Sequence, residues 1–539
     1  MNKKLQSWKA IARYFDCSER TVRRWEANEG MPVHRHSHIR GARIAAYQHE
    51  LDIWFESKSS KSNELVSLNK STYKVAILPF ELRDAATEQS YIRDALCEDI
   101  ISDLASLQSF TVISYSSMKY LPTDDEKRKA TIEQMNLNFF IEGSIRLDKE
   151  QITLKLRLIN ATTHSVQWSK SYSETRSSYE ALRERSTADI VSCLAISDVE
   201  GEFLSQSHNR IFNQSAWEYL HQARQESMRW QPESIKKALE LLHCAQHLVG
   251  KNGIILANLG RTYLQLREAG IDCSLTPLNK VETILEQLKV DKANEYYTFM
   301  LSGWFEYACG KTIKAIESLK LAVYKHNNDP DVLGLLSNCY LISGHARLAL
   351  PLIRRLQIID PLTPVSRCLP GWYHIILGEF DAAVVHYERM FEMDTQNDIA
   401  KMFLAWVYAL NNRYDKQKVL SLQMQNECAP SLAIMLARVF CTEPDQSGRQ
   451  INLSQEQIET AKTNEMFARF LAFAYAHIGD SDEAILWLNS AVKLGFCAFP
   501  FVTRHAPFFK DNIEYQPLKL VLKEMKLQWD RIGEHAGKM

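Results

Sequence analysis

Residues 330–361, PDVLGLLSNCYLISGHARLALPLIRRLQIIDP, contain the pattern that decides the fold of most of this chain. Gly344 belongs to a series spaced by 34 residues: Gly310, Gly344, Gly378 and Asn412. Five residues after each of them stands a member of a second series: Ala315, Ala349, Ala383 and Gln417. Glycine and asparagine tolerate the positive φ of a tight turn, and alanine lets two helices approach closely. The pattern predicts antiparallel helix pairs that stack along the chain from about residue 210.

Tetratricopeptide repeats have this 34-residue period, and the sequence fills several other positions of that family. The matching residues are Tyr340, Phe380 and Tyr475 beside the turns, and Pro330 and Pro361 at the ends of units. The resemblance implies an all-α solenoid over residues 210–535 whose groove takes a protein or peptide partner. Copies become irregular from Gln417 through residues 420–465, so seven to nine are expected, and residues 496–529 are expected to cap the last pair. A solenoid that only spaces or dimerises other domains is the alternative.

The N-terminal residues show a different pattern, with two short amphipathic segments joined by a tight turn. Leu5, Trp8, Ile11 and Phe15 fall on one face of a helix predicted over residues 5–15. A second helix is predicted over residues 19–29, and Gly30 and Pro32 end it. Residues 33–41 then alternate with period two, which is typical of a short β wing, and residues 44–54 predict a third helix. Together these segments predict a small winged helix-turn-helix over residues 1–56.

The outward face of the second helix carries the side chains expected to contact DNA. Arginine forks grip guanine or phosphate, and asparagine contacts adenine, so this face suits a major-groove recognition helix. The residues expected to bind on this helix are Arg20, Thr21, Arg23, Arg24 and Asn28, and those expected on the wing are Arg35, His36 and Arg40.

Three runs in this segment resemble the excisionase/MerR-type winged helix: residues 7–15 (SWKAIARYF), 20–26 (RTVRRWE) and 30–36 (GMPVHRH). The resemblance covers about residues 5–56. It implies base and phosphate contacts from Arg20, Thr21, Arg23 and Arg24, and wing contacts from Arg35, His36 and Arg40.

Charge is distributed unevenly along the chain. Residues 1–43 hold ten Lys and Arg against four acids, a balance of +6, so the rest of the chain carries −7. A basic end on an acidic body indicates a chain that presents one end to a polyanion. A merely solvated charged face, a module that docks protein, and a metal site at His34, His36 and His38 are the alternatives. Trp8, Trp25 and Trp54 are expected in the core of the module.

Residues 57–72 are rich in Ser and Lys and are predicted to be a flexible linker. After them the pattern predicts an α/β sandwich over residues 73–195. Strands are expected at 74–80, 110–115, 138–147, 151–160 and 165–172, with helices at 88–107, 129–137 and 177–195. Ile152, Leu154, Leu156 and Leu158 alternate, as in a sheet with one covered face.

This region resembles the TolB-like domain found in bacterial regulators and beside nucleotide cyclases. The likeness rests on residues 75–80 (VAILPF), 140–146 (FIEGSIR), 157–161 (RLINA) and Trp168. Gly143 is interpreted as allowing a turn, a bulge or close packing. Glu98, Asp99 and Asp103 are interpreted as the wet face of a helix, with a catalytic carboxylate pair as the alternative.

The sequence lacks the motifs of several chemistries. It has no Gly-rich phosphate loop, no nucleophile elbow and no zinc-ligand spacing, so neither an enzymatic activity nor a cofactor or metal is expected. Its 11 scattered cysteines do not form a disulfide framework, and it shows neither a membrane-length apolar run nor a signal peptide. We expect a cytoplasmic one-component transcription regulator that binds double-stranded DNA as a homodimer, with a tetratricopeptide scaffold as the rival.

Overall fold

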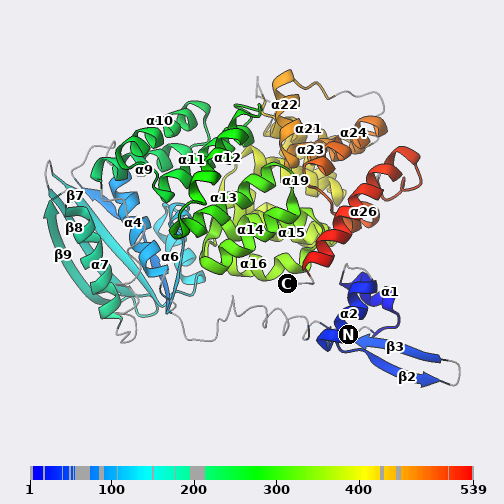
Figure 1. The fold of residues 1–539 in the computed structure, drawn as a ribbon, viewed down its shortest axis with the longest axis horizontal. Helices are drawn as coiled ribbons and strands as arrows, with labels where there is room; N and C mark the ends of the chain where they lie inside the picture. Colours follow the sequence, from blue (N-terminus) through cyan, green and yellow to red (C-terminus); the bar gives the residue numbers. More distant parts are fainter. Residues whose placement is uncertain are drawn as a thin grey trace.

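A computed structural model describes residues 4–15, 19–38, 41–47, 50–51, 54, 73–83, 90–105, 107, 109–148, 151–175, 178–194, 213–424, 430–444, 451–507 and 509–536. In Figure 1 a small N-terminal module lies at one end, a sheet with its helices at the other, and a stack of helices joins them. Arg40 of the predicted wing, the predicted linker over residues 57–72 and residues 1–3 lie outside the described residues.

The described residues of the N-terminal module form the helices α1 and α2, a three-stranded antiparallel sheet of order β1-β3-β2, and helical positions at Glu50, Leu51 and Trp54. Its elements are β1 (Lys4–Leu5), α1 (Trp8–Tyr14), α2 (Glu19–Glu29), β2 (His34–His38) and β3 (Gly41–Tyr47). The bounds of α2 are those predicted, and β2 confirms the alternating segment as a strand. In Figure 1 the β2–β3 hairpin extends away from the rest of the molecule.

Two predictions for this module were wrong. The first helix begins at Trp8, because Ser7 accepts the backbone N–H of Ala10 (3.0 Å) and so caps it. Leu5 instead pairs with Ala46 in the sheet. Ile44 and Tyr47 belong to β3, where Ile44 pairs with Arg35 of β2 and Tyr47 pairs with Lys4 of β1, whereas Leu51 and Trp54 of the predicted third helix are helical.

The α/β region has a mixed sheet of order β6-β4-β7-β8-β9, with β5 also pairing β7. The elements are β4 (Tyr73–Ile77), β5 (Glu81–Arg83), α4 (Ser90–Ala105), β6 (Phe110–Val112), α5 (Tyr115–Lys119), α6 (Asp125–Gln134), β7 (Phe139–Leu147), β8 (Gln151–Asn160), β9 (Val166–Thr175) and α7 (Tyr179–Cys193). Every predicted strand and helix of this region is present. The short β5 and α5 were not predicted.

The sheet is covered on both faces by different parts of the chain. Val75 and Ile77 face the cluster that contains α4, α7 and the first solenoid helices, whereas Ala76 and Leu78 face a cluster with α5 and α6. The four alternating residues of β8, from Ile152 to Leu158, are all buried. Gly143 serves close packing, since a Cβ there would lie 2.8 Å from the ring of Phe80.

The acidic side of α4 is not a wet face, contrary to the sequence interpretation. Asp99 accepts hydrogen bonds from the Tyr179 hydroxyl (2.9 Å) and the Trp217 indole (3.4 Å). Asp103 lies 3.2 Å from the guanidinium of Arg183, a buried side chain of α7. Glu98 lies 3.5 Å from Arg224 of the first solenoid helix. These acids join α4 to α7 and to the solenoid.

The described residues from 213 onward form helices that run from α9 and α10, beside the sheet at the left of Figure 1, to α26 at the right. The helices are α9 (Gln214–Ser227), α10 (Pro232–Val249), α11 (Gly253–Glu268), α12 (Thr276–Leu288), α13 (Glu295–Ala308), α14 (Thr312–Lys325), α15 (Pro330–Ile342), α16 (Ala346–Ile359), α17 (Pro364–Ile376), α18 (Phe380–Met393), α19 (Asp398–Leu410), α20 (Tyr414–Leu422), α21 (Leu432–Phe440), α22 (Gln455–Thr463), α23 (Glu465–Ile478), α24 (Ser481–Lys493), α25 (Phe499–Arg504) and α26 (Gln516–Ala536). None of the helices in the described ranges is long and apolar enough to cross a membrane.

The turn and packing positions of the repeat are confirmed. The turn residues have positive φ: Gly310 (71°), Gly344 (75°), Gly378 (77°) and Asn412 (52°). The alanines of the second series are fully buried between helices. At the degenerate copy, Gln417 occupies the same buried place and donates its amide to the carbonyl of Phe440 (2.7 Å). Consecutive helices therefore form a solenoid that resembles tetratricopeptide-repeat proteins.

The C-terminal segment does not simply cap the last helix pair. It runs along the turns of three repeats, where Thr312 donates to the carbonyl of Gly495 (3.2 Å) and the N–H of Cys497 donates to Ile342 (2.9 Å). Phe496, Phe501 and Phe509 of this segment are fully buried in the core. The tail therefore packs along the edge formed by the turns of α13–α14 through α17–α18.

Replacing Gly344 by asparagine tests this contact. The same turn conformation is tolerated by an asparagine at position 412, but a Cβ on Gly344 would lie 2.9 Å from Cα of Ala498. We expect overpacking to lower the free energy of unfolding by about 1–3 kcal/mol. Thermal unfolding monitored by circular dichroism measures the loss of stability. Asn412→Gly, the reverse exchange at the corresponding turn, is the control. Equal stability of Gly344→Asn and the wild type would show that the tail does not press on this turn.

Candidate nucleic-acid interface

The arginines of α2 differ in how they are held. Arg20 is exposed on the helix surface. Arg23 is also exposed, and its guanidinium lies 5.1 Å from the ring centroid of Trp8. Arg24 is half-buried, and its Nε and Nη2 are shielded from water and have no hydrogen-bond partner among the described residues. Arg20 and Arg23 are therefore more accessible than Arg24, and Arg23 lies over the ring of Trp8.

The hairpin is tied to the helices by an ion pair and by a hydrogen bond. Arg35 of β2 lies 2.6 Å from Glu26 of α2, with 57% of the Arg35 side chain exposed. His34 lies 2.5 Å from Glu50 and stacks edge-on against Tyr47. The pair of Arg35 with Glu26 holds β2 beside α2, so the exposed part of Arg35 lies next to that helix.

The other expected contact residues are only partly described. Thr21 and Asn28 lie on α2 and His36 lies on β2, but their side chains are outside the described set. Arg40 is not described at all, and the metal alternative falls on His36 and His38, whose side chains are likewise outside it. Among the described residues, no group of three metal-ligating side chains is close enough to hold an ion.

A compact aromatic core supports this surface. Phe15 packs edge-on against Trp25 (5.5 Å between centroids) and Trp54 (6.2 Å), and Val22 is fully buried behind them. Trp25 and Trp54 are thus core residues, as expected. Trp8 is half-buried and has a second role, because its ring lies under Arg23.

The module contacts the solenoid through α1. The guanidinium of Arg347, on α16, lies 4.1 Å from the ring centroid of Tyr14 and 5.1 Å from that of Phe15. The contact therefore involves α1 and not α2, the proposed recognition helix. Arg20 and Arg23 on α2 remain exposed while the module is docked.

Two residues of this surface were missed from the sequence: Glu26, the partner of Arg35, and Trp8, the support of Arg23. The sequence pattern placed Trp8 at a core position of a helix, but it did not indicate that the Trp8 ring supports Arg23. Glu26 gave no signal, because its partner stands nine residues away across the turn between α2 and β2.

Comparison with known proteins identifies part of the chain. Residues 71–186 match the family model of the HilA/YgeH-like transcriptional regulator, second domain. A curated relative, putative adenylate cyclase 3 from Rhizobium meliloti (strain 1021), is 28% identical over 170 residues, which are 31% of this chain and 29% of the relative. The match thus spans under a third of the relative. We expected a chain without enzymatic activity, and this relative contradicts that expectation because its name is that of an enzyme.

Two solved structures show similarity to this chain at low sequence identity. A tetratricopeptide repeat protein from Parabacteroides merdae ATCC 43184 is 12% identical, with a TM-score of 0.31, covering 58% of this chain and 100% of that one. Yeast Tom70 is 12% identical with a TM-score of 0.33, covering 89% of this chain and 91% of that one. Residues 71–186 are therefore similar to the second domain of HilA/YgeH-like transcriptional regulators, within a chain that ends in a helical solenoid.

Proposed function

We propose that the protein is a transcription regulator that binds duplex DNA through a winged helix-turn-helix over residues 1–56. The observation that carries this proposal is the surface of α2, where Arg20 and Arg23 are exposed beside the Arg35-bearing strand of the hairpin. A recognition helix enters the major groove with such side chains, and a basic hairpin contacts backbone phosphate. The balance of +6 over residues 1–43 supports a polyanionic partner.

The rest of the chain supplies the regulatory part in this proposal. Residues 57–72 act as the linker, residues 73–195 as the α/β domain, TolB-like in its sequence, and residues 210–535 as a solenoid for a protein partner. The match of residues 71–186 to a transcriptional regulator domain supports this assignment. Because one such module contacts about half an operator, a homodimer bound to a two-fold site is the natural assembly.

To test this proposal, genomic DNA fragments that bind the purified full-length protein are selected. The affinity of the protein for the enriched sequence is then measured. Each arginine of α2 that contacts a base should contribute about 1–3 kcal/mol to the binding free energy. We therefore expect a loss of this size in each of the variants Arg20→Ala, Arg23→Ala and Arg24→Ala. Affinity should fall steeply as salt rises, because phosphate contacts release counterions. Fluorescence anisotropy with labelled duplexes at several salt concentrations measures both effects.

Arg229→Ala is the matched control, since Arg229 is an exposed arginine on the solenoid that pairs with Glu226 (2.9 Å). It should leave DNA binding unchanged. Unaltered binding by an Arg20→Ala/Arg23→Ala double variant would rule out α2 as the recognition helix. Failure to enrich any DNA would favour a module that docks protein.

A further inference from the structure

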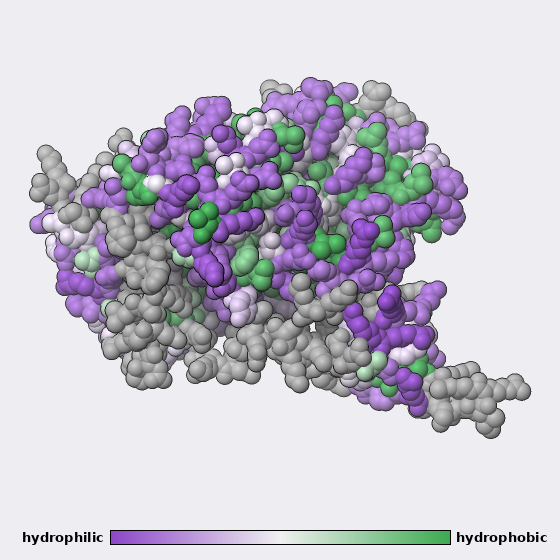
Figure 2. Space-filling model, viewed as in Figure 1, coloured by the Kyte–Doolittle hydropathy of each residue, from purple (hydrophilic) through white to green (hydrophobic). Residues whose placement is uncertain are grey.

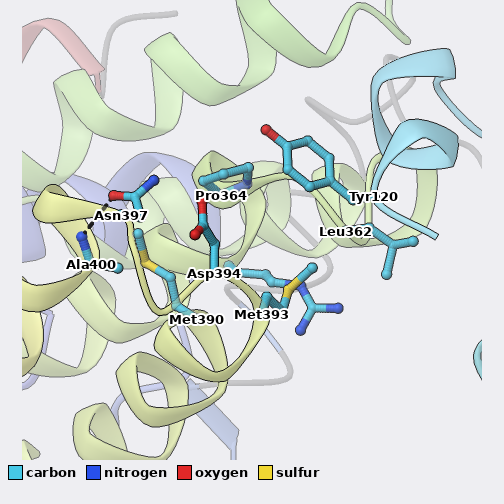
Figure 3. Close-up of a pocket in the computed structure, with 9 residues that line it drawn as sticks. Tyr120, Leu362, Pro364, Met390, Met393, Asp394, Asn397 and Ala400 are labelled. Carbon is cyan, nitrogen blue, oxygen red and sulfur yellow. Dashed lines mark hydrogen bonds between the residues drawn. The ribbon is translucent and has the colours of Figure 1, made fainter. Parts of the chain in front are cut away.

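The hollow between α5 and the turn from α16 to α17 is too small for a ligand (Figure 3). Tyr120 and Leu362 line it together with Arg367 and Asp394. It has room for about one water molecule, so it belongs to the packed junction between the α/β region and the solenoid. A surface that suits a second protein molecule lies elsewhere, on the C-terminal helix α26.

Helix α26 has one buried face and one exposed face. The buried face consists of apolar residues in the core of the solenoid: Leu518, Val521, Leu522, Met525 and Ile532. The exposed face carries Leu520, which is 72% exposed, and Leu527, which is 45% exposed. Because seven residues make about two turns of helix, the two leucines lie in a single stripe. In Figure 2 hydrophobic residues are gathered at the end of the molecule where α24 and α26 lie.

Charged side chains flank this stripe, and none of them is paired within the described part of the chain. Four exposed residues of α26 form no ion pair there: Lys523, Glu524, Arg531 and Glu534. The lysines and the aspartate away from the stripe are paired, Lys519 with Glu514 (2.6 Å) and Lys526 with Asp530 (2.6 Å). The exposed face of α26 therefore combines two leucines with two unpaired cations and two unpaired anions.

A second copy of the same helix supplies the complement of this face when the two helices run parallel. In a parallel pair related by a two-fold axis, equivalent residues meet, so each leucine contacts its own counterpart. Lys523 and Glu524 lie on opposite sides of the stripe, so Lys523 of one copy faces Glu524 of the other. Arg531 and Glu534 are arranged in the same way one to two turns later. The two-fold axis makes each of these ion pairs twice.

The antiparallel orientation is disfavoured by the same charges. An antiparallel pair that covers both leucines places Leu520 opposite Leu527 of the second copy. That arrangement brings Lys523 beside Lys523 and Glu524 beside Glu524, where like charges repel. The charge pattern of α26 therefore selects the parallel pair.

The C-terminal end of α26 lies next to the segment that contacts the N-terminal module. The ring of Trp529 stacks on that of His345 (5.6 Å between centroids), and Arg347, two residues later, contacts Tyr14 of α1. Figure 1 shows this end of α26 beside the module. Because two parallel helices end together, both modules of such a dimer lie at the same end of the assembly, as a two-fold operator requires.

We propose that α26 is the surface through which two copies of this chain form a parallel, two-fold dimer, with Leu520 and Leu527 at its centre and Lys523–Glu524 pairs at its flanks. The use of this dimer on a two-fold operator rests on the proposed function, whereas the pairing itself depends only on α26. A pair of helices of 21 residues, about 30 Å long, is a small interface, so we expect a dimer that dissociates on dilution.

Cysteine crosslinking of the full-length protein tests the geometry. Under mild oxidation, Leu520→Cys and Leu527→Cys should each give a covalent dimer on a non-reducing gel, because equivalent residues meet in a parallel pair. In the antiparallel pair, equivalent positions stand about 10 Å apart along the helix, which is too far for a disulfide. Lys526→Cys, on the side of α26 away from the stripe, is the matched control. The wild type controls for the exposed Cys244.

Charge reversal tests the flanking pairs, with the dimer dissociation constant measured by sedimentation equilibrium. Lys523→Glu and Glu524→Lys should each weaken the dimer about tenfold, because each places like charges opposite one another at two positions. The double variant Lys523→Glu/Glu524→Lys exchanges the two charges and should restore the wild-type affinity. Leu520→Lys/Leu527→Lys should give a monomer with an unchanged circular dichroism spectrum, because both leucines are exposed.

Three outcomes would overturn this proposal. The wild type sediments as a monomer throughout the concentration series, it dimerises while neither single cysteine variant crosslinks, or the double charge exchange stays as weak as the single reversals. All of these measurements are made without DNA. A protein that dimerises through α26 but binds no duplex would refute the proposed function and leave this inference standing, and a monomer that binds the selected fragments would do the reverse.

Discussion

Arg469→Ala is expected to lower the free energy of unfolding by about 3–5 kcal/mol, because it leaves a buried carboxylate without its counter-charge. Arg469 and Glu465 stand one turn apart on α23 at 2.7 Å, with only 3% and 4% of their side chains exposed. The guanidinium also lies 4.3 Å from the ring centroid of Trp372 and 5.6 Å from that of Phe496. Arg469 therefore joins α17, α23 and the C-terminal segment.

A double replacement distinguishes the charge from the packing. Within the part of the chain that the structure describes, Arg469 Nη1 and Glu465 Oε2 have no hydrogen-bond partner, so the pair is incompletely satisfied and costly to bury. We expect Arg469→Met/Glu465→Leu to recover most of the stability lost in Arg469→Ala. Lys462→Ala, which breaks an exposed pair with Glu459, should change stability by less than about 1 kcal/mol. Urea unfolding monitored by circular dichroism measures the free energy of unfolding of all three variants. If Arg469→Ala lowered it by no more than Lys462→Ala does, the buried pair would not stabilise the fold as expected.

Asp360→Ala is expected to detach the solenoid turn from the α/β region. Asp360 is 4% exposed and accepts hydroxyl hydrogen bonds from Ser114 and Ser117 (2.8 Å) of the α/β region. It also accepts from Thr363 and Ser366 (3.1 Å) of the solenoid. Hydrogen bonds to a charged group contribute about 1.5–3 kcal/mol each, so we expect a loss of at least about 3 kcal/mol at this junction.

Hydrogen exchange measures this loss locally. In Asp360→Ala the amides of Ser114 and Leu362, which bond across the junction, should exchange faster by about two orders of magnitude, as a change of 3 kcal/mol requires. Amides of α9 and α10 should be unaffected. Asp381→Ala, an exposed acid of α18, is the control. Unchanged exchange at Ser114 in Asp360→Ala would show that the carboxylate does not hold the two parts together.

Local features of the fold were predictable wherever a short stretch of sequence determined them. The turn at Gly344 needs positive φ, Ala349 needs a small side chain, and β8 alternates along one strand. Each of these requirements depends only on a few residues that are close together in the sequence. The bounds of α2 were likewise set by its own face and by the Gly30 that ends it. The candidate site was predictable in part, since Arg20 and Arg23 are exposed on the expected face.

The errors arose where the partner of a residue comes from elsewhere in the chain. Leu5 fits the helical pattern of its neighbours, but a strand edge at Ala46 was available to it. The acids of α4 have the spacing of a solvated helix face, and only the approach of α7 and α9 pairs them with Arg183 and Arg224. Local periodicity cannot distinguish these outcomes, because both leave the same pattern in the sequence.

By itself the sequence determined the repeat, its turns, the strands of the α/β region and the basic N-terminal end, because backbone preference, side-chain volume and net charge are properties of nearby residues. Tertiary structure alone decided that the C-terminal segment lies along three turns and that Asp360 bonds to Ser114, 246 residues away. It also decided that Glu26 pairs with Arg35 across the turn between α2 and β2. The physical reason is that such contacts depend on which surfaces meet when helices and sheet pack, and that packing is set by the whole chain.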